Sequence, residues 1–330
     1  MNLAGKTLPF NGSWGRPGRF QGPVCQFPGQ GDRANTETIT LFTDGNPMKL
    51  FRHGPQGAER PGLVDAQGIW RDLSGVVDDI APAALGPDSM ARLASLDATS
   101  LPLVPSGARL GPCVGSVGNV VCIGLNYADH AAEAGLKAPG QPIVFNKHRG
   151  AISGPNDDVW LAPGSQKLDW EVELGVVIGS RAFHVSEADA LRHVAGYCLV
   201  NDVSERAYQI EYEGQWAKGK SYPTHCPLGP WLVTPDELGN PQEVDLWLDV
   251  NGQRRQTGNT RTMIFGVAQI VSYLSRFMAL EPGDVIPTGT PPGVGMGAKP
   301  PVYLQAGDVV SLGGRGLGEQ RQRVVPTPMA

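Results

Sequence analysis

The sequence has few cysteines and few histidines, and neither residue type shows the spacing of a structural metal site. Five cysteines occur in 330 residues, and no two of them form a CxxC pair. A disulfide scaffold or a structural zinc site would need patterned cysteines. We therefore predict reduced thiols in a cytoplasmic protein. The cysteines are Cys25, Cys113, Cys122, Cys198 and Cys226.

Long apolar runs and long basic runs are also absent. No apolar stretch is long enough to cross a bilayer, and the N-terminus lacks the basic-then-apolar pattern of a secretory signal. The net charge is -5, and no basic segment is present that could follow a nucleic-acid backbone. We therefore expect neither a membrane nor a nucleic acid as a partner.

Glycine and proline, by contrast, are abundant, with 44 and 29 residues. So many turn formers favour a β-rich body over a helical bundle. A chain of 330 residues, 41% of them hydrophobic, suffices for one large domain or for a large and a small one. The sequence shows no repeats. We predict an α+β fold that is dominated by strands and has peripheral helices.

The chain divides into three predicted regions. Residues 1–47 carry turn formers throughout and no sustained periodicity, which predicts a flexible extension. From Met48, short strands alternate with turns and predict a small N-terminal α+β domain over residues 48–112, with one short helix near residues 89–96. Residues 113–330 form the predicted main domain.

Strands dominate the prediction for the main domain. Alternating apolar residues over 244–250 precede Asn251-Gly252, a pair that suits the type I′ turn of a β-hairpin. The other predicted strands are apolar runs between turn signals. They cover residues 119–124, 142–148, 169–179, 196–203, 229–234 and 308–314.

Two helices are predicted in the same domain. The first covers residues 186–194, where Ser186 can act as the N-cap. The second covers residues 266–277 and carries one apolar stripe, which would face the core. The stripe consists of Ile270, Leu274, Phe277 and Met278.

The predicted strand over 169–179 carries two acidic residues, Glu171 and Glu173. Side chains alternate along a strand, so both carboxylates project from one face, opposite Trp170 and Val172. Two like charges on an apolar strand repel, and burial makes them more costly. Water, basic side chains or a cation could compensate them.

A third acid, Asp202, ends another apolar strand. Three carboxylates from two strand ends make a hard-oxygen site, which suits Mg²⁺ and, similarly, Mn²⁺. The few cysteines and histidines nearby argue against zinc. In the alternative interpretation, the three acids are solvated or paired with Lys and Arg.

A short helix is predicted from about Tyr127 to Ala134, ended by Gly135. It places His130 and Glu133 three residues apart on one face. A carboxylate orients an imidazole and raises its basicity, which suits a general base that acts on water. An ordinary surface pair on a helix is the alternative. Glycines at both ends would let this helix move as a lid.

Two loops supply further candidates. In "GKSYPTHCPLGP", Lys220 could neutralise the acids or hold a substrate carboxylate, unless it is an ordinary surface lysine, and Thr224 offers a hydroxyl. In "TGTPPGVGMG", residues 288–297, backbone N–H groups could form an anion nest. This loop matches neither the P-loop nor the dinucleotide fingerprint.

Taken together, these motifs resemble the fumarylacetoacetate hydrolase family. The motifs occur in the family's order over residues 114–325, and the segment from Met48 resembles the smaller N-terminal unit of its bacterial members. They are "GLNYADHAAEAG", "DWEVELGVVIG", "NDVSERAYQ", "GKSYPTHCPLGPW", "VNGQRRQ" and "IPTGTPPGVG". The resemblance implies a mixed β-roll and a homodimer.

The resemblance also implies roles for individual residues. A divalent ion, Mg²⁺ or Mn²⁺, would be bound by Glu171, Glu173 and Asp202. His130, Glu133 and Lys220 would be catalytic, the first two as the pair that activates water. Substrate contacts would come from Lys147, Gln209, Thr224 and Thr290.

The implied activity is catabolic hydrolysis of a C–C bond in a 2,4-dioxo acid, either an acylpyruvate or a 2,4-diketo-3-deoxy sugar acid, which releases pyruvate or a similar 2-oxo acid. The family also contains ureidoglycolate lyases, oxaloacetate decarboxylases, and isomerases and hydratases of hydroxymuconate-type acids. A binding protein that kept the metal but lost turnover is another alternative.

One loop departs from the family pattern. After Lys220 and Ser221, family members commonly have an aromatic residue, Asp, Thr and Phe, whereas this chain has Pro223 in place of the Asp and His225 in place of the Phe. Proline removes a donor and restricts the residue before it. His225 is expected as a packed or solvent-facing histidine rather than as an added acid–base group.

Overall fold

The structure is a computed structural model that describes residues 47–133 and 137–328, without the side chains of residues 130–132. The predicted extension therefore lies outside the described residues, except for Pro47. The described residues belong to one compact unit. Among them, no helix combines the length and the hydropathy that crossing a membrane requires.

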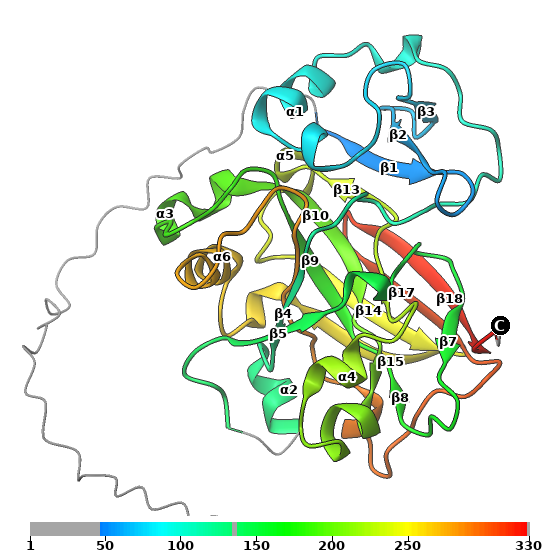
Figure 1. Ribbon diagram of the computed structural model, residues 1–330, viewed down its shortest axis with the longest axis vertical. Coiled ribbons are helices and arrows are strands. Elements are labelled where there is room, and N and C mark those ends of the chain that lie inside the picture. Colours follow the sequence, from blue (N-terminus) through cyan, green and yellow to red (C-terminus); the bar gives the residue numbers. More distant parts are fainter. Residues whose placement is uncertain (1–46, 134–136, 329–330) are drawn as a thin grey trace, which may run out of the picture. The chain divides into compact units, whose positions relative to one another are not determined.

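A nine-stranded mixed sheet runs through the molecule (Figure 1). Its neighbouring strands are antiparallel, except that β16 and β4 are parallel. In spatial order the strands are β3 (Trp70–Asp72), β2 (Arg60–Val64), β1 (Lys49–His53), β13 (Leu232–Val233), β10 (Val194–Asn201), β9 (Val172–Ile178), β16 (Val285–Pro287), β4 (Val120–Gly124) and β5 (Ile143–Lys147).

A second sheet has five strands, and two short strand pairs accompany it. Its order is β15 (Gln253–Asn259), β14 (Asp245–Val250), β17 (Val309–Gly314), β18 (Gly318–Pro326) and β7 (Val159–Leu161). The pairs are β11 (Ser204–Glu205) with β8 (Leu168–Asp169), and β12 (Cys226–Pro227) with β6 (Ile152–Ser153). The predicted strand-dominated α+β fold is confirmed.

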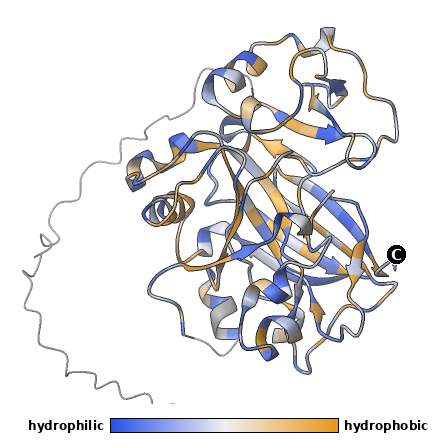
Figure 2. Ribbon diagram, viewed as in Figure 1, coloured by the Kyte–Doolittle hydropathy of each residue, from blue (hydrophilic) through white to orange (hydrophobic). Residues whose placement is uncertain are grey.

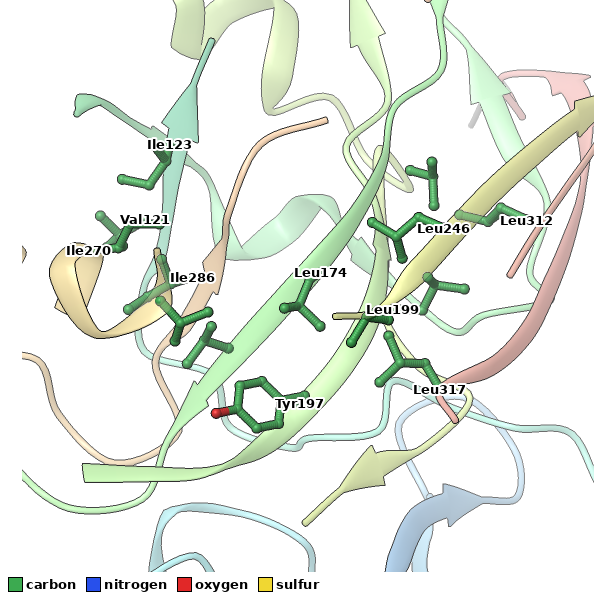
Figure 3. Close-up of a cluster of buried hydrophobic side chains, with 14 of the residues drawn as sticks. Val121, Ile123, Leu174, Tyr197, Leu199, Leu246, Ile270, Ile286, Leu312 and Leu317 are labelled. Atoms are coloured by element: carbon green, nitrogen blue, oxygen red, sulfur yellow. The ribbon is translucent and has the colours of Figure 1, made fainter. Parts of the chain in front are cut away.

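The main core is built from both sheets. Leu174 on β9 and Leu199 on β10 belong to the same buried cluster as Leu246 on β14 and Leu312 on β17 (Figure 3). Burying a leucine side chain contributes about 1.5–3 kcal/mol, so this contact holds the two sheets together. The predicted alternation over 244–250 is confirmed, because its apolar side chains are buried.

The predicted hairpin joins β14 to β15. Asn251 has φ 52° and Gly252 has φ 76°, and the type I′ turn requires positive φ at both positions.

Hydropathy along the strands is uneven. In Figure 2, the central strands β9 and β10 are largely apolar, whereas β18 is largely hydrophilic. Two polar side chains of β18, Gln320 and Gln322, are nevertheless buried. They are hydrogen-bonded to each other, and Gln322 also accepts a hydrogen bond from Asn201 on β10. Buried amides of this kind tie the two sheets together.

Six α-helices of the described residues lie around the sheets. Ser186 caps α3 by accepting the N–H of Asp189, as predicted. Ile270 of α6 packs near Val121 in the core (Figure 3). The helices are α1 (Pro87–Ala94), α2 (Ala128–Glu133), α3 (Glu187–Ala190), α4 (Trp216–Lys220), α5 (Pro235–Leu238) and α6 (Val267–Ser275).

The predicted stripe on the last helix is wrong at one position. Ile270 and Leu274 are fully buried and Met278 packs against the core, but Phe277 is 65% exposed. The helix ends at Ser275, so Phe277 does not continue its helical period.

The region 48–112 contains β1, β2, β3 and the predicted short helix, α1. Strand β1 pairs with β13 through Leu50 and Leu232, so these N-terminal strands extend the large sheet. The division into two domains at residues 112 and 113 stays a prediction.

Candidate metal centre

Three buried carboxylates meet where β9 begins and β10 ends. One oxygen each of Glu171, Glu173 and Asp202 lies within 4.8 Å of the other two. The register of the two strands pairs Asn201 with Val172, and the N–H of Asp202 donates to the carbonyl of Glu171 at 2.9 Å. The strand pairing therefore brings together the three acids that the sequence singled out.

The predicted acidic strand is interrupted between β8 and β9. Side chains replace the missing ladder there: Asn201 Oδ1 accepts from Glu171 N–H at 3.3 Å, and Gln256 Oε1 accepts from Val172 N–H at 3.0 Å. The Thr290 hydroxyl donates to the Val172 carbonyl at 2.9 Å. These bonds fix the backbone between the two glutamates.

Basic side chains compensate the acids. Lys220 Nζ lies 2.8 Å from both Glu171 Oε2 and Asp202 Oδ2. Lys147 Nζ lies 2.5 Å from Asp202 Oδ1, and Arg206 Nη2 lies 2.7 Å from Glu171 Oε1. All of these cations are buried. The pairing with Lys and Arg that the sequence left open is therefore present.

Sequence reasoning missed Arg206 and its partner Asp169. Arg206 Nε lies 2.8 Å from Asp169 Oδ2, and its Nη1 donates to Gln209 at 3.0 Å. Asp169 also accepts the N–H of Gly295 at 2.6 Å. Both residues stand inside the motifs quoted above, and an arginine four positions after Asp202 is the signal that could have found them.

Burial and charge shift the pKa values in this cluster. Burial raises the pKa of Glu173 well above its usual range, and the charges of Asp202 and Glu171 add to the effect. Burial alone would lower the pKa of Lys220, but the carboxylates of Asp202 and Glu171 outweigh it and raise the pKa. Arg206 behaves in the same way beside Asp169 and Glu171. The two cations therefore stay charged.

The donor set fits a hard divalent cation. Its three oxygens lie within 4.8 Å of one another, and opposite ligands of a Mg²⁺ or Ca²⁺ ion are roughly 4–5 Å apart. When all groups are ionised, four buried carboxylates face three buried cations and leave a net charge of -1. A cation would relieve that excess. The groups are Asp169, Glu171, Glu173 and Asp202 against Lys147, Arg206 and Lys220.

Backbone N–H groups of the Gly/Pro loop over 288–297 bind carboxylates of the protein itself, and a nest for a substrate anion stays a prediction. The N–H of Gly289 donates to Glu173 Oε2 at 2.7 Å. The N–H of Met296 donates to Asp169 Oδ2 at 3.0 Å. These N–H groups hold one metal-ligand candidate and the partner of Arg206.

The same loop holds Glu133, at the end of α2. Both carboxylate oxygens of Glu133 lie 3.0 Å from the N–H of Gly293. His130 lies in α2, but its side chain is outside the described residues, as are residues 134–136. The water-activating pair of His130 and Glu133 therefore stays a prediction.

The predicted substrate-contact residues and the predicted catalytic Lys220 occupy different places. Gln209, Lys220 and Thr290 line a cavity beside the acids. Lys147 contacts Asp202 from outside that lining. Thr224 does not line the cavity, and its hydroxyl accepts the N–H of Trp160 at 2.7 Å. The substrate-binding role of Thr224 stays a prediction.

The departure from the family pattern leaves a packed histidine. His225 is fully buried, and its Nε2 lies 2.9 Å from the carbonyl of Trp160, so Nε2 carries the proton. Burial lowers the pKa of His225 to about 3, so the ring is neutral near pH 7. Pro223, the other changed residue, is exposed.

The cavity has a volume of about 260 Å³ and includes two of the acids in its wall. Its lining combines the polar centre with apolar side chains. The polar residues are Glu171, Glu173, Arg206, Gln209, Lys220 and Thr290, and the apolar ones are Ile123, Leu125, Phe145, Ile210, Trp216 and Met296.

Close backbone packing positions Lys220. Helix α4 lies against a π-helical turn, Ala207–Glu211, which carries Gln209. A Cβ at Gly219 would lie 2.4 Å from the carbonyl of Glu205 and 2.5 Å from the N of Gln209. Only glycine allows this approach, which sets Lys220 and Gln209 side by side at the cavity.

The chain was compared with known proteins. A family model described as "Fumarylacetoacetate (FAA) hydrolase C-terminal" matches residues 119–325. A Burkholderia orbicola (strain AU 1054) protein named "Putative hydrolase" is 60% identical over 277 residues, which cover 84% of this chain and 98% of that protein.

Two solved structures are also similar. Fumarylacetoacetate hydrolase from psychrophilic Exiguobacterium antarcticum is 37% identical with a TM-score of 0.75, covering 85% of this chain and 100% of that one. A 2-hydroxyhepta-2,4-diene-1,7-dioate isomerase from Mycobacterium marinum is 31% identical with a TM-score of 0.69, covering 86% and 100%. From its matching model, relatives and fold, this chain belongs to the fumarylacetoacetate hydrolase family.

Proposed function

We propose that this protein is a metal-dependent hydrolase that cleaves a C–C bond in a 2,4-dioxo acid, an acylpyruvate or a 2,4-diketo-3-deoxy sugar acid. One observation carries the proposal: a cavity lined by Glu171 and Glu173, with Asp202 beside them and Lys220 held between the acids. Mg²⁺, or Mn²⁺ as the alternative, suits these oxygens.

The charge of the centre supports an anionic substrate. With all of these groups ionised, a divalent ion would change the net charge of the cluster from -1 to +1, and a single substrate carboxylate would then neutralise it. When bound, the ion would polarise a keto oxygen of the substrate. Glu171, Glu173 and Asp202 would hold it.

Lys220 would act on the leaving carbanion. Its raised pKa keeps the ammonium protonated, and it lines the cavity at hydrogen-bonding distance from two metal-ligand candidates. An ammonium at this place stabilises the enolate oxygen that develops as the C–C bond breaks. Arg206 lines the same cavity and suits the substrate carboxylate.

Glu133 and His130 would activate water as the nucleophile. Glu133 is anchored to the loop at Gly293, and one helical turn of α2 separates it from His130. The imidazole would take a proton from water, which attacks the distal keto carbon. The bond to the enolate carbon then breaks, and the enolate takes up that proton to give pyruvate and an acid.

A product survey tests this proposal. The full chain is incubated with acylpyruvates and diketo-deoxy sugar acids, with magnesium or with a chelator, and the products are followed by NMR. We expect pyruvate and one acid, in the magnesium sample only. Glu171→Gln should lose most of the activity, because it removes one anionic ligand. Absence of turnover in every magnesium sample would reject the proposal.

A second candidate is isomerisation of a related unsaturated acid. The likeness to the Mycobacterium marinum isomerase favours it. The same carboxylates and Lys220 would stabilise an enolate without water attack. An NMR spectrum that shows a shifted double bond and no pyruvate would establish this reaction, and carbon dioxide or urea would point to a decarboxylase or a ureidoglycolate lyase.

We further propose a cytoplasmic homodimer. The four described cysteines are buried and free, which suits a reducing compartment. Sedimentation at several concentrations tests the assembly, and a monomer throughout would exclude the dimer.

A further inference from the structure

The cavity beside the acids has a divided lining. Each polar side chain in its described wall belongs to the acid cluster or is bonded to it: Lys220 and Arg206 to Glu171, Gln209 to Arg206, and Thr290 to the backbone of Val172. The rest of the described wall is apolar. Polar recognition is therefore concentrated on one part of a bound molecule.

An aromatic pair forms the centre of the apolar wall. The rings of Trp216 and Phe145 meet edge to face, with centroids 5.3 Å apart. Trp216 lies directly on the backbone of Gly124, where a Cβ would come 2.6 Å from its ring. The Phe145 centroid is 5.0 Å from Lys220 Nζ. Both rings thus lie next to the polar centre.

Helix α4 connects the two parts of the cavity. Trp216 and Lys220 are four residues apart on this helix, so they share one face, and α4 lies next to β5, which carries Phe145. Ile210, on the π-helical turn, lines the cavity and is 51% exposed. The apolar wall therefore continues from the acid cluster to the solvent.

We propose that the Trp216–Phe145–Ile210 wall recognises the acyl tail, so that the substrates are 2,4-dioxo acids with a short apolar tail rather than hydroxylated sugar acids or dicarboxylates. This inference rests on the proposed function and narrows its substrate class. A hydroxyl or carboxylate at this wall would lose water without gaining a partner among the described side chains, which is unfavourable.

The size of the cavity limits the tail. The cavity has a volume of about 260 Å³, and the head group occupies part of it. The tail is therefore a short chain or one small ring.

Binding of non-cleavable probes tests the wall separately from the reaction. Straight-chain 2-oxo acids from 2-oxobutanoate to 2-oxooctanoate are titrated into the magnesium-loaded full chain by calorimetry. Each added methylene should tighten binding about fourfold until the cavity is full. Trp216→Ala should flatten this dependence on chain length. Trp247→Ala is the matched control, because Trp247 stacks on Arg254 at 4.8 Å outside the cavity wall, and it should leave the dependence unchanged.

A second variant tests the wall by gain of function. Ile210 is half exposed, so Ile210→Lys should fold, and the new ammonium should favour a tail that ends in a carboxylate. We expect 2-oxoadipate to gain at least tenfold in affinity relative to 2-oxohexanoate. Ile69→Lys, at an exposed residue outside the wall, should change neither affinity.

The outcomes separate the two proposals. If no 2-oxo acid binds, the proposed function and this inference fall together. If the probes bind but affinity ignores chain length, or polar tails bind as tightly as alkyl tails, the inference falls and the proposed function stands. An unchanged preference in Ile210→Lys would likewise remove Ile210 from the wall.

Discussion

Replacing Lys220 by methionine tests how the acids are balanced. The Nζ of Lys220 contacts Glu171 and Asp202 at 2.8 Å each, and the side chain is 2% exposed. Methionine fills similar space but leaves two carboxylates without this partner. Removing one member of a buried ion pair costs about 3–5 kcal/mol. We expect Lys220→Met to lower the free energy of unfolding by that amount in chelator.

Urea unfolding of wild type and variant measures this loss. Magnesium should restore part of the variant's stability, because a cation replaces the lost positive charge. Lys167→Met is the matched control: Lys167 pairs with Glu211 at the surface, where both side chains are well exposed. Such a pair contributes at most about 1 kcal/mol.

Two results would refute this reasoning. If Lys220→Met loses no more than Lys167→Met, the acids are not held by this ammonium. If magnesium stabilises the variant no more than an equal concentration of sodium sulfate, no divalent ion replaces it at these carboxylates.

Three further substitutions follow from the same contacts. Gln256→Leu removes the amide oxygen that accepts the Val172 N–H, so the free energy of unfolding should fall by about 1–3 kcal/mol. Calorimetry should also show weaker magnesium binding, and an unchanged magnesium affinity would mean that Gln256 does not position the metal-ligand candidates. Gly219→Ala forces a methyl carbon against the Glu205 carbonyl, so most turnover should be lost while the circular-dichroism spectrum stays that of the folded protein. Full turnover would disprove the close approach of Gly219 to Glu205. Burial lowers the pKa of His225 from 6.5 to about 3, so the unfolded chain binds a proton that the folded protein does not bind between these pH values. Relative to His225→Phe, the free energy of unfolding of the wild type should therefore fall by about 1.4 kcal/mol per pH unit as the pH drops from 6.5 toward 3. Equal changes in the urea midpoints of both proteins between pH 6.5 and 3 would contradict this.

The metal-ligand candidates were predictable from local patterns. Glu171 and Glu173 stand two residues apart in an apolar stretch, and Asp202 directly follows another such stretch. Alternation along a strand and the scarcity of other ligands were enough to group them. The hairpin at Asn251-Gly252 was predictable for the same reason, since two adjacent residues determine its turn.

The residues that hold the acids were not predictable in this way. Asn201 accepts the N–H of Glu171 and Gln256 accepts the N–H of Val172, and the two amides approach this backbone from two different strands. Their amides replace strand hydrogen bonds, whereas the apolar pattern over 169–179 predicted one unbroken strand. Phe277 shows the same limit, because its apolar character suggested burial while the end of α6 at Ser275 left it exposed.

The loop over 288–297 binds both a metal-ligand candidate and acids outside the metal-ligand set. Its glycines are needed because its backbone N–H groups bind the carboxylates directly. Gly293 has φ 104°, and a Cβ there would lie 2.0 Å from the carbonyl of Arg255. In that position its N–H reaches Glu133, while other N–H groups of the loop reach Glu173 and Asp169. One backbone segment thus fixes a metal-ligand candidate, the partner of Arg206 and the acid of α2. The Gly/Pro pattern suggested an anion nest, but it could not report which carboxylates the loop binds, because backbone N–H groups are the same in every amino acid except proline.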